Sequence, residues 1–186
     1  MKYYTTIKLL VLVLLIGCLL AGTAGANSDD VITQAREILD ATGTQGGIVV
    51  HLGCGNGKLT AALRVSDRYT IHGLEANPAR VAKARDYIKA KGIYGAVSVE
   101  RHSGSTLPYT DNLINLIVVQ NAGRVAMNEV MRVLAPGGAA FVQRNDKWQK
   151  VVKARPDNID HWSHFLHDAS NNAVADDSVV GPPRSL

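Results

Sequence analysis

Three alternating glycines, Gly53, Gly55 and Gly57, follow the apolar residues 48–52 and precede a helix-forming segment. A strand that ends at such glycines lets backbone N–H groups come close to a ligand at the N-terminus of the next helix. We therefore expect the ligand site at the first strand-to-helix turn of a doubly wound sheet. A dinucleotide fingerprint would place its third glycine where Lys58 stands, so a nucleotide-dependent oxidoreductase is the weaker interpretation.

Apolar strands alternate with helical patterns along most of the chain. The segment 113–119 is apolar at nearly every position, which is typical of a strand buried on both faces. Alternation of strands and helices predicts an α/β fold, a parallel sheet with helices on both faces. The expected strands are 48–52, 69–74, 97–100, 113–119 and 139–143, and the expected helices are 29–42, 58–63, 77–91 and 124–134.

Several segments, in the right order, resemble class I S-adenosylmethionine-dependent methyltransferases over residues 48 to about 143. Besides the glycine loop, Glu75 closes the second strand, where this family has an acid that accepts both ribose hydroxyls of its cofactor. Residues 107–109 and 129–138 resemble the family's Leu-Pro-Phe and Glu-x-x-Arg-Val-Leu-x-Pro-Gly-Gly segments. The resemblance implies a Rossmann-like, doubly wound, mostly parallel sheet. For the family's last two strands, usually an antiparallel pair, we expect no counterpart here.

The resemblance further implies S-adenosylmethionine as the cofactor and transfer of its methyl group to an acceptor that the sequence does not identify. The implied chemistry is an SN2 transfer from a sulfonium, in which the protein contributes binding, alignment and exclusion of water. Such a transfer needs no general base when the acceptor is already nucleophilic, so we predict no catalytic residue. The cofactor-binding residues carried over from the family are His51, Gly53, Cys54, Gly55, Gly57, Glu75, Ala76, Ser105 and Gln120.

Some positions depart from the family pattern. His51 stands where many members have an acid near the cofactor's amino group. Asn115 replaces an Asp that is frequent in the family at the start of the fourth strand. Ser103, Gly104 and Ser105 occupy the region where an Asp commonly contacts the adenine amine. With the missing last strands, these departures keep open an alternative function, a non-catalytic binding or scaffold module.

Charge and histidine placement exclude two classes of partner. Without residues 1–26, which hold two lysines and no acid, the formal charge falls from +4 to +2, and nucleic-acid binding would need a clustered basic face. His161, His164 and His167 are spaced by three, but no acid or cysteine is placed to complete a metal site. We therefore expect no nucleic-acid partner and no bound metal.

The first residues predict export from the cytoplasm. Lys2 and Lys8 precede or flank a short apolar run, and Ala24-Gly25-Ala26 supplies a small-residue cleavage site, the features of a secretory signal peptide. We place the signal peptide at 1–26 and the protein in the periplasm or cell envelope. The alternative is a lipoprotein, because Leu15-Ile16-Gly17-Cys18 resembles a lipobox that would lipidate Cys18. Membrane contact is expected through these segments alone.

The chain changes character after the predicted methyltransferase-like domain at 27–150. Residues 151–186 predict a linker or the start of a further domain. The segment 160–168 and the later Gly-Pro-Pro-Arg at 181–184 resemble the beginning of a PQQ-like β-propeller. Large exported bacterial proteins, notably planctomycete ones, are similar in joining a methyltransferase-like domain to such a propeller. Export also favours the scaffold alternative, because the cofactor is made in the cytoplasm.

Overall fold

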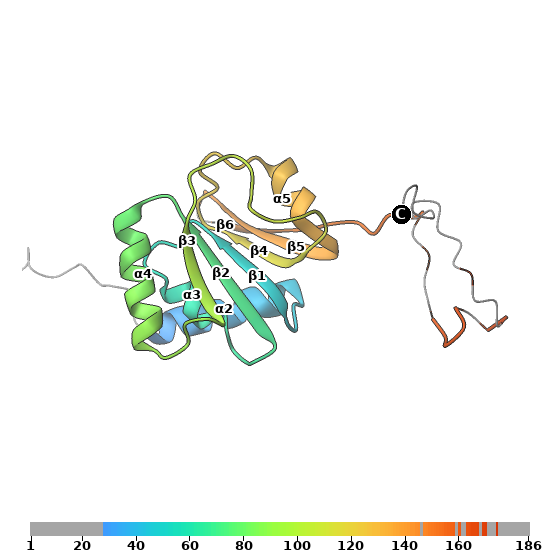
Figure 1. Ribbon diagram of the computed structural model, residues 1–186, viewed down its shortest axis with the longest axis horizontal. Coiled ribbons are helices and arrows are strands. Elements are labelled where there is room, and N and C mark those ends of the chain that lie inside the picture. The colour runs from blue at the N-terminus through green and yellow to red at the C-terminus, as the bar shows by residue number, and fades with distance from the viewer. Residues whose placement is uncertain are drawn as a thin grey trace, which may run out of the picture.

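The computed structural model describes residues 28–145, 147–158, 160, 163–167, 169, 170 and 174 (Figure 1). Six strands form one sheet in the order β3-β2-β1-β4-β5-β6, in which β6 alone runs antiparallel to its neighbour. This topology confirms the predicted Rossmann-like fold. The elements are α2 (Ser28–Thr42), β1 (Gly47–Leu52), α3 (Lys58–Ala62), β2 (Tyr69–Glu75), α4 (Pro78–Ala90), β3 (Val97–Arg101), β4 (Ile114–Val119), α5 (Met127–Val133), β5 (Leu134–Arg144) and β6 (Lys147–Val152).

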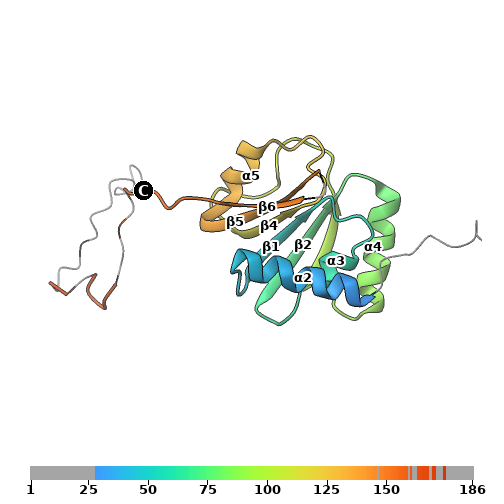
Figure 2. The same cartoon turned by 180° about the vertical axis from the view of Figure 1, so that it is seen from behind.

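The two faces of the sheet are covered differently. On what we call the helical face, α2, α3 and α4 pack over the strands (Figure 2), and on the other side α5 packs over β4 and β5. We call this second side the loop face, because residues 102–113, which connect β3 to β4 there, contain no helix. Strand β4 serves both faces, since Leu116 and Val118 enter one core and Ile117 and Val119 the other.

Helix α4 shows why the local sequence signals were reliable. The Asn77 side chain accepts hydrogen bonds from the backbone N–H groups of Ala79 and Arg80, and Pro78 follows at the first helical position. The helix ends before Gly92, whose φ of +69° belongs to the left-handed region that glycine adopts without strain. The predicted helix and its two ends are thereby confirmed.

An additional strand corrects in part the expectation that the family's last two strands have no counterpart here. Strand β6 pairs antiparallel with β5 from Lys147 to Val152, and the Trp148 ring stacks on Phe141 with centroids 5.0 Å apart. All of its residues are exposed or half-buried, as is usual for an edge strand. Because several of them are polar, the sequence did not show the apolar pattern by which the other strands were predicted. The backbone of Lys153 continues the pairing to Gly137 and Gly138.

Two element boundaries also differ from the prediction by more than one residue. Helix α5 begins at Met127 rather than at 124, because residues 122–125 form a turn in which Gly123 has a φ of +55°. The Ala-Pro-Gly-Gly segment at 135–138 does not separate helix from strand, since β5 already begins at Leu134 and passes through this segment with an irregular register opposite β4.

The predicted leader and most of the predicted propeller segment lie outside the described residues, and His161 is among those left out. In the tail, the Arg155 guanidinium donates to the Asp160 carbonyl, and His167 Nε2 lies 2.5 Å from the Asp160 carboxylate. None of the helices in the described part of the chain is long and apolar enough to cross a membrane. Those same described residues include no group of His, Cys, Asp or Glu arranged to hold a metal ion.

Candidate functional site

A cleft opens at the carboxyl edge of the parallel strands, where the loops after β1, β2, β3 and β4 meet. In an open α/β sheet this edge, at the point where strand order reverses, is where ligands bind. Here the reversal lies between β1 and β4, as the strand order requires. The residues lining the cleft are Leu52, Gly53, Leu74, Glu75, Ala76, His102, Ser103, Gly104, Asn121, Ala122, Gly123 and Val125.

The Glu75 carboxylate holds two of these loops together. Its side chain is at the end of β2, and the residue is only 6% exposed. One oxygen accepts the backbone N–H of Gly55 at 2.9 Å, and the other accepts that of Asn77 at 3.0 Å. A carboxylate offers about four lone-pair directions, so each oxygen can still accept from a ligand. The predicted acid therefore lies in the cleft with acceptor capacity that its two backbone partners leave unused.

The three glycines of the loop serve different purposes. A Cβ on Gly53 would lie 2.6–2.8 Å from atoms of Asn121, and one on Gly57 would lie 2.8 Å from the Ala84 Cβ in α4. These two positions therefore allow close approach of neighbouring elements. Gly55, with a φ of +56°, has open space where its Cβ would point. Gly55 thus leaves a bare backbone beside Glu75, and this opening could receive a ligand.

His51 lies beneath the glycine loop and is completely buried. Its Nε2 is 2.9 Å from the Gln120 amide oxygen and its Nδ1 is 2.9 Å from the Thr60 hydroxyl. With the amide oxygen as acceptor, Nε2 carries the proton and Nδ1 accepts from Thr60. Burial lowers the pKa of His51 to about 4, against the opposing effects of Gln120 and the Glu75 charge. His51 is therefore neutral at physiological pH, and with Gln120 it supports the loop from behind.

Cys54 is a packing residue in the described structure. It is buried, and its Sγ would be 2.9 Å from a Cβ on Gly73, so the two residues fit against each other at the sheet. Burial, assisted by the negative charge of Glu75, raises the pKa of the Cys54 thiol to about 12. A thiol of that pKa is protonated at physiological pH and is a poor nucleophile.

The remaining sequence candidates divide between the cleft and its surroundings. Ala76 lines the cleft, whereas Gln120 contributes through His51, and Ser105 is exposed and is not among the lining residues. The neighbouring Ser103 and Gly104 are the residues of that segment that line it.

A second loop is held in place by charge. Arg132 in α5 donates to the carbonyls of Leu107 and Tyr109 and forms ion pairs with Asp111 and Glu129. The Glu129 carboxylate also accepts the Leu107 backbone N–H at 2.7 Å. Hydrogen bonds from Arg132 and from Leu107 lower the pKa of Glu129 to about 2. This pair, the first and fourth residues of the Glu-x-x-Arg segment, clamps residues 107–111 over the loop face.

Comparison with known proteins agrees with this geometry. Residues 49–138 match the family described as a methyltransferase domain. This segment is just under half of the chain and is similar to a methyltransferase domain. A curated relative, the ubiquinone/menaquinone biosynthesis C-methyltransferase of Idiomarina loihiensis, is 28% identical over 153 residues, covering 77% of this chain and 60% of the relative. The chain spans about half the length of the curated relatives it matches.

Solved structures share the fold of the matched segment. Geranyl diphosphate C-methyltransferase from Streptomyces coelicolor, solved with Mg²⁺, geranyl diphosphate and S-adenosyl-L-homocysteine, superimposes with a TM-score of 0.52 at 16% identity, over 66% of this chain and 53% of that one. The [4+2]-cyclase SpnF gives 0.54 at 24% identity, over 60% and 43%. Because one of these two proteins is a cyclase, the fold alone does not establish methyl transfer.

Sequence reasoning missed two features of the candidate site. His102 lines the cleft, and its Nε2 is buried with no hydrogen-bond partner among the described residues. Thr60 completes the hydrogen bonding of His51 from one turn into α3. The position of His102 just after β3 could have indicated the first of these, whereas the pairing of Thr60 depends on how α3 packs and has no local signal.

Proposed function

We propose that the carboxyl-edge cleft binds S-adenosylmethionine and that the domain transfers its methyl group to an acceptor not yet identified. The observation that carries this proposal is the nearly buried Glu75 carboxylate, which lines the cleft and accepts the backbone N–H groups of Gly55 and Asn77. Two similar structures are of methyltransferases in complex with SAM or with S-adenosyl-L-homocysteine, which supports the choice of ligand.

The residues present fit such a ligand. Glu75 offers acceptors for two vicinal hydroxyl groups, and the open side of Gly55 admits a close approach of the ligand to the backbone. The neutral imidazole of His51 places no positive charge behind the loop, so a cationic sulfonium or ammonium would meet no repulsion there. When bound, S-adenosylmethionine supplies a methyl group activated by its positive sulfur.

The chain's own part is to bind and orient the reacting groups and to exclude water. Leu52, Leu74 and Val125 give the cleft apolar walls, and they limit the access of water to the site of transfer. His102 is the imidazole among the lining residues, and its unpartnered Nε2 could bind a polar group of either ligand. With no base assigned, the acceptor we propose is one that is already nucleophilic, such as a carbanion-like carbon, an amine or a thiolate.

The cleft is narrow, with a volume of about 50 Å³, so a ligand of nucleoside size requires neighbouring loops to move apart. The loops after β3 and β4 carry Gly104 and Gly123, and a backbone without Cβ atoms changes conformation readily. We therefore expect hydrogen exchange at 102–104 and 121–125 to change on binding, while exchange within α2 stays constant.

The test is calorimetric titration of the full chain with S-adenosylmethionine and S-adenosyl-L-homocysteine. We expect micromolar binding, weakened at least about tenfold by Glu75→Gln, because a carboxylate bonded to ligand hydroxyls contributes roughly one such factor or more. Glu100→Gln is the matched control, since this exposed acid lies near the end of the neighbouring strand and does not line the cleft. Urea unfolding should show that both variants fold, with Glu75→Gln the less stable, because its amide nitrogen cannot accept one of the two backbone N–H groups.

Absence of binding at millimolar ligand by a folded sample would overturn the proposal. The domain would then be a non-catalytic scaffold, which is the alternative that the sequence left open. If Glu75→Gln left the affinity for S-adenosylmethionine unchanged, the protein would bind this cofactor at a place other than the cleft.

Export and attachment to a PQQ-like propeller remain predictions from sequence. We propose that the leader directs the protein to the periplasm or envelope and is removed after Ala26. N-terminal sequencing and mass measurement of the protein recovered from its producing cell would show Asn27 as the first residue, or a lipidated Cys18 under the lipoprotein alternative.

A further inference from the structure

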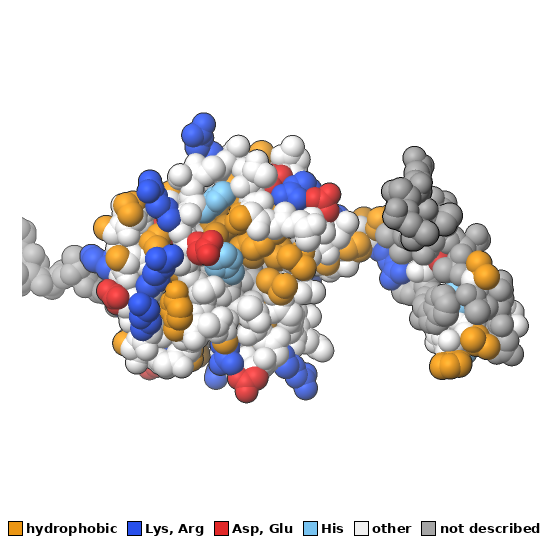
Figure 3. All heavy atoms as spheres, viewed as in Figure 1, with side chains coloured by type: hydrophobic (Ala, Val, Ile, Leu, Met, Phe, Trp, Pro, Cys, Tyr) orange, Lys and Arg blue, Asp and Glu red, His pale blue; other side chains and the backbone are white. Residues whose placement is uncertain are grey.

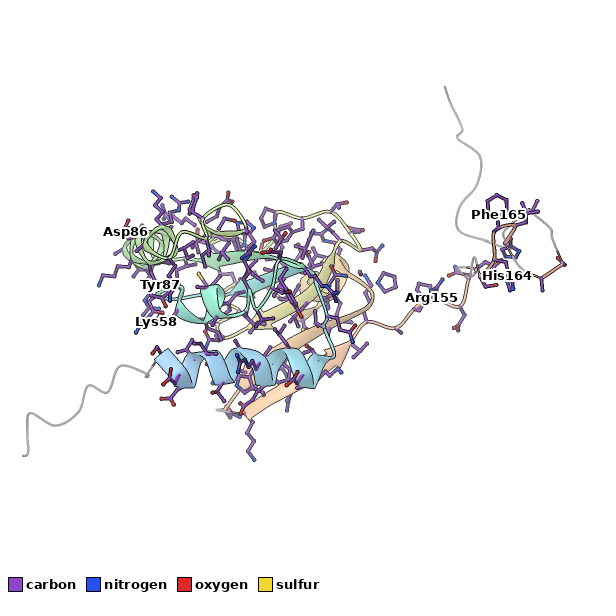
Figure 4. The ribbon with its side chains drawn as sticks, turned by 90° about the horizontal axis from the view of Figure 1, so that it is seen from below. Lys58, Asp86, Tyr87, Arg155, His164 and Phe165 are labelled. Carbon is purple, nitrogen blue, oxygen red and sulfur yellow. The ribbon has the colours of Figure 1, made fainter. Side chains whose placement is uncertain are left out.

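A groove lies on the helical face, between α2, α3 and α4 and away from the cleft. Its volume is about 430 Å³, within the range of about 300–1,000 Å³ that is usual for small-molecule sites. Figure 4 shows Tyr87 and Lys58 side by side below α4, on the side toward α2. The residues lining the groove are Ser28, Val31, Ile32, Arg36, Lys58, Ala61, Ala62, Arg64, Val65, Tyr87 and Lys91.

The floor of the groove is apolar and partly open to solvent. Ile32 from α2 and Val65 from the turn after α3 are 43% and 48% exposed, which is unusual for adjoining large apolar side chains on a small domain. Val31, Ala62 and the Tyr87 ring complete this surface while packing against the core beneath. A hydrocarbon group placed here would remove these side chains from water.

The rim of the groove is basic. Four of its lining residues are Arg or Lys and none is acidic. The acids nearest in sequence are all exposed, and none of them lines the groove: Asp29, Asp30, Glu37, Asp67 and Asp86. Figure 4 places Asp86 beside α4, apart from Tyr87 and Lys58.

Arg64, which lines the groove, has an N–H group without a hydrogen-bond acceptor in the described part of the chain. Its Nη2 pairs with the exposed Asp67 at 2.5 Å, but its Nε is buried and has no hydrogen-bond partner among the described residues. A buried guanidinium N–H without an acceptor costs free energy that an acidic ligand would recover. Lys91 lies with its Nζ 5.4 Å from the centre of the Tyr87 ring and keeps a positive charge over the apolar floor.

We propose that this groove binds a single-chain amphiphile with an acidic headgroup, a molecule of the long-chain carboxylate class. The apolar floor would take the hydrocarbon chain, and Arg36, Arg64 and Lys91 would surround the acid. A concave site of this volume encloses one chain, whereas a bilayer surface would contact only the rim. This site is separate from the cleft and does not depend on the methyltransferase proposal.

The experiment titrates the full chain with monomeric dodecanoate below its micelle concentration and locates binding by amide chemical-shift changes. We expect one molecule to bind, with shifts concentrated at 28–36, 58–65 and 87–91. Dodecyltrimethylammonium, with the same chain and a cationic head, and acetate, with the acid alone, should each bind at least about tenfold more weakly.

Two variants test the two halves of the site. Arg36→Glu/Lys91→Glu should weaken dodecanoate binding about tenfold or more, because it replaces attraction by repulsion at the rim. The matched control is Arg80→Glu/Lys83→Glu, which makes the same charge change at exposed positions of α4 outside the groove. Ala62→Phe should also abolish binding by filling the floor, with the far-ultraviolet circular dichroism unchanged.

Three outcomes overturn the proposal. These are no binding of monomeric dodecanoate, equal binding of the cationic amphiphile, and an equal loss in the charge-reversal variant and its control. Binding to phosphatidylglycerol vesicles without binding of monomeric dodecanoate would also overturn it and would assign the basic rim to a membrane surface.

Discussion

The helical face and the loop face of one sheet are built by different means. On the helical face, α2, α3 and α4 bury apolar side chains from every parallel strand. On the loop face, α5 covers β4 and β5, while residues 102–113 pass over β2 and β3 without forming a helix. The strands anticipate this difference, since β2 and β3 direct Ile71, Val97 and Val99 to the helices and His72, Ser98 and Glu100 to the other side.

The comparison shows that nondirectional burial can be replaced by a few directional contacts. Histidine and acidic side chains gather on the loop face beside apolar ones (Figure 3). There, the Tyr109 hydroxyl is 2.7 Å from His72 Nδ1, the two rings meet edge to face, and His72 Nε2 is 3.8 Å from Glu100. Together with the bonds of Arg132 and Glu129, these contacts hold residues 102–113 against the sheet, where a helix would otherwise be held by buried apolar side chains.

The largest expected effect is a difference in the free energy of unfolding between substitutions at two neighbouring residues of β2. Ile71→Ala should destabilise the domain by about 2–5 kcal/mol, because it leaves a cavity under the helices. Thr70→Ala, one residue away on the loop face, should cost less than about 1 kcal/mol. Urea unfolding of both variants measures the difference, and similar costs would contradict the division between the faces.

The second prediction removes the clamp of the loop face. Arg132→Gln should speed hydrogen exchange at residues 107–111 on the order of tenfold, because it removes the bonds to two carbonyls and the ion pairs. Exchange in α2 and α4 should stay unchanged. Arg124→Gln, an exposed arginine in the turn before α5, is the control. A uniform increase across both faces would show that Arg132 supports the whole fold instead.

The third prediction concerns the pH dependence of stability and compares His51 on the helical face with His72 on the loop face. His51 keeps a folded-state pKa of about 4, below the ordinary value of about 6.5, so on acidification the unfolded chain takes up the proton first. Stability should therefore fall as the pH decreases from about 6.5 to about 4. Burial also lowers the pKa of His72, but this ring, which is 18% exposed, faces Glu100, and that charge opposes the shift.

Replacement of each histidine tests this assignment. His51→Gln should flatten the dependence of the unfolding free energy on pH in that range, and His72→Gln should flatten it less. Urea unfolding at a series of pH values measures both slopes. If the two variants gave the same slope, the complete burial of His51 on the helical face would not be the cause of the pH dependence of stability.

The smallest expected effect concerns the single hydrogen bond between Tyr109 and His72. Tyr109→Phe keeps the edge-to-face ring contact and removes the hydroxyl, so it should cost about 1 kcal/mol. A change of that size is measurable as a lower urea midpoint with an unchanged slope. No change would mean that water replaces the hydroxyl at this exposed edge.

The sequence predicted the helical face better than the loop face, for a physical reason. Strand alternation, the Asn77 cap and the glycine after α4 are local signals, and each produced the expected element. The loop face depends on contacts between distant segments, such as Arg132 with Tyr109, which no local pattern encodes. Strand β6 was missed because an edge strand keeps its polar residues in water.

The candidate site shows the same division. Glu75 and the glycine loop could be placed at the sheet edge from sequence, because the ends of parallel strands meet there. The pairing of His51 with Gln120 and Thr60, and the position of His102 in the cleft, depend on three-dimensional packing. Ser105 was carried over from the family pattern for this segment, whereas its neighbours Ser103 and Gly104 line the cleft in the structure.

The attachment of Lys153 has a consequence for protein engineering. Its Nζ donates to the Asn112 side chain and to the carbonyls of Arg132 and Leu134, while its backbone pairs with Gly137 and Gly138. A fusion joint or a proteolytic cut placed just before this residue would remove these contacts, leaving the end of the edge strand and the end of α5 without them. A joint placed after it would leave the folded unit complete, so Lys153 marks the earliest position at which another module can be exchanged behind the domain.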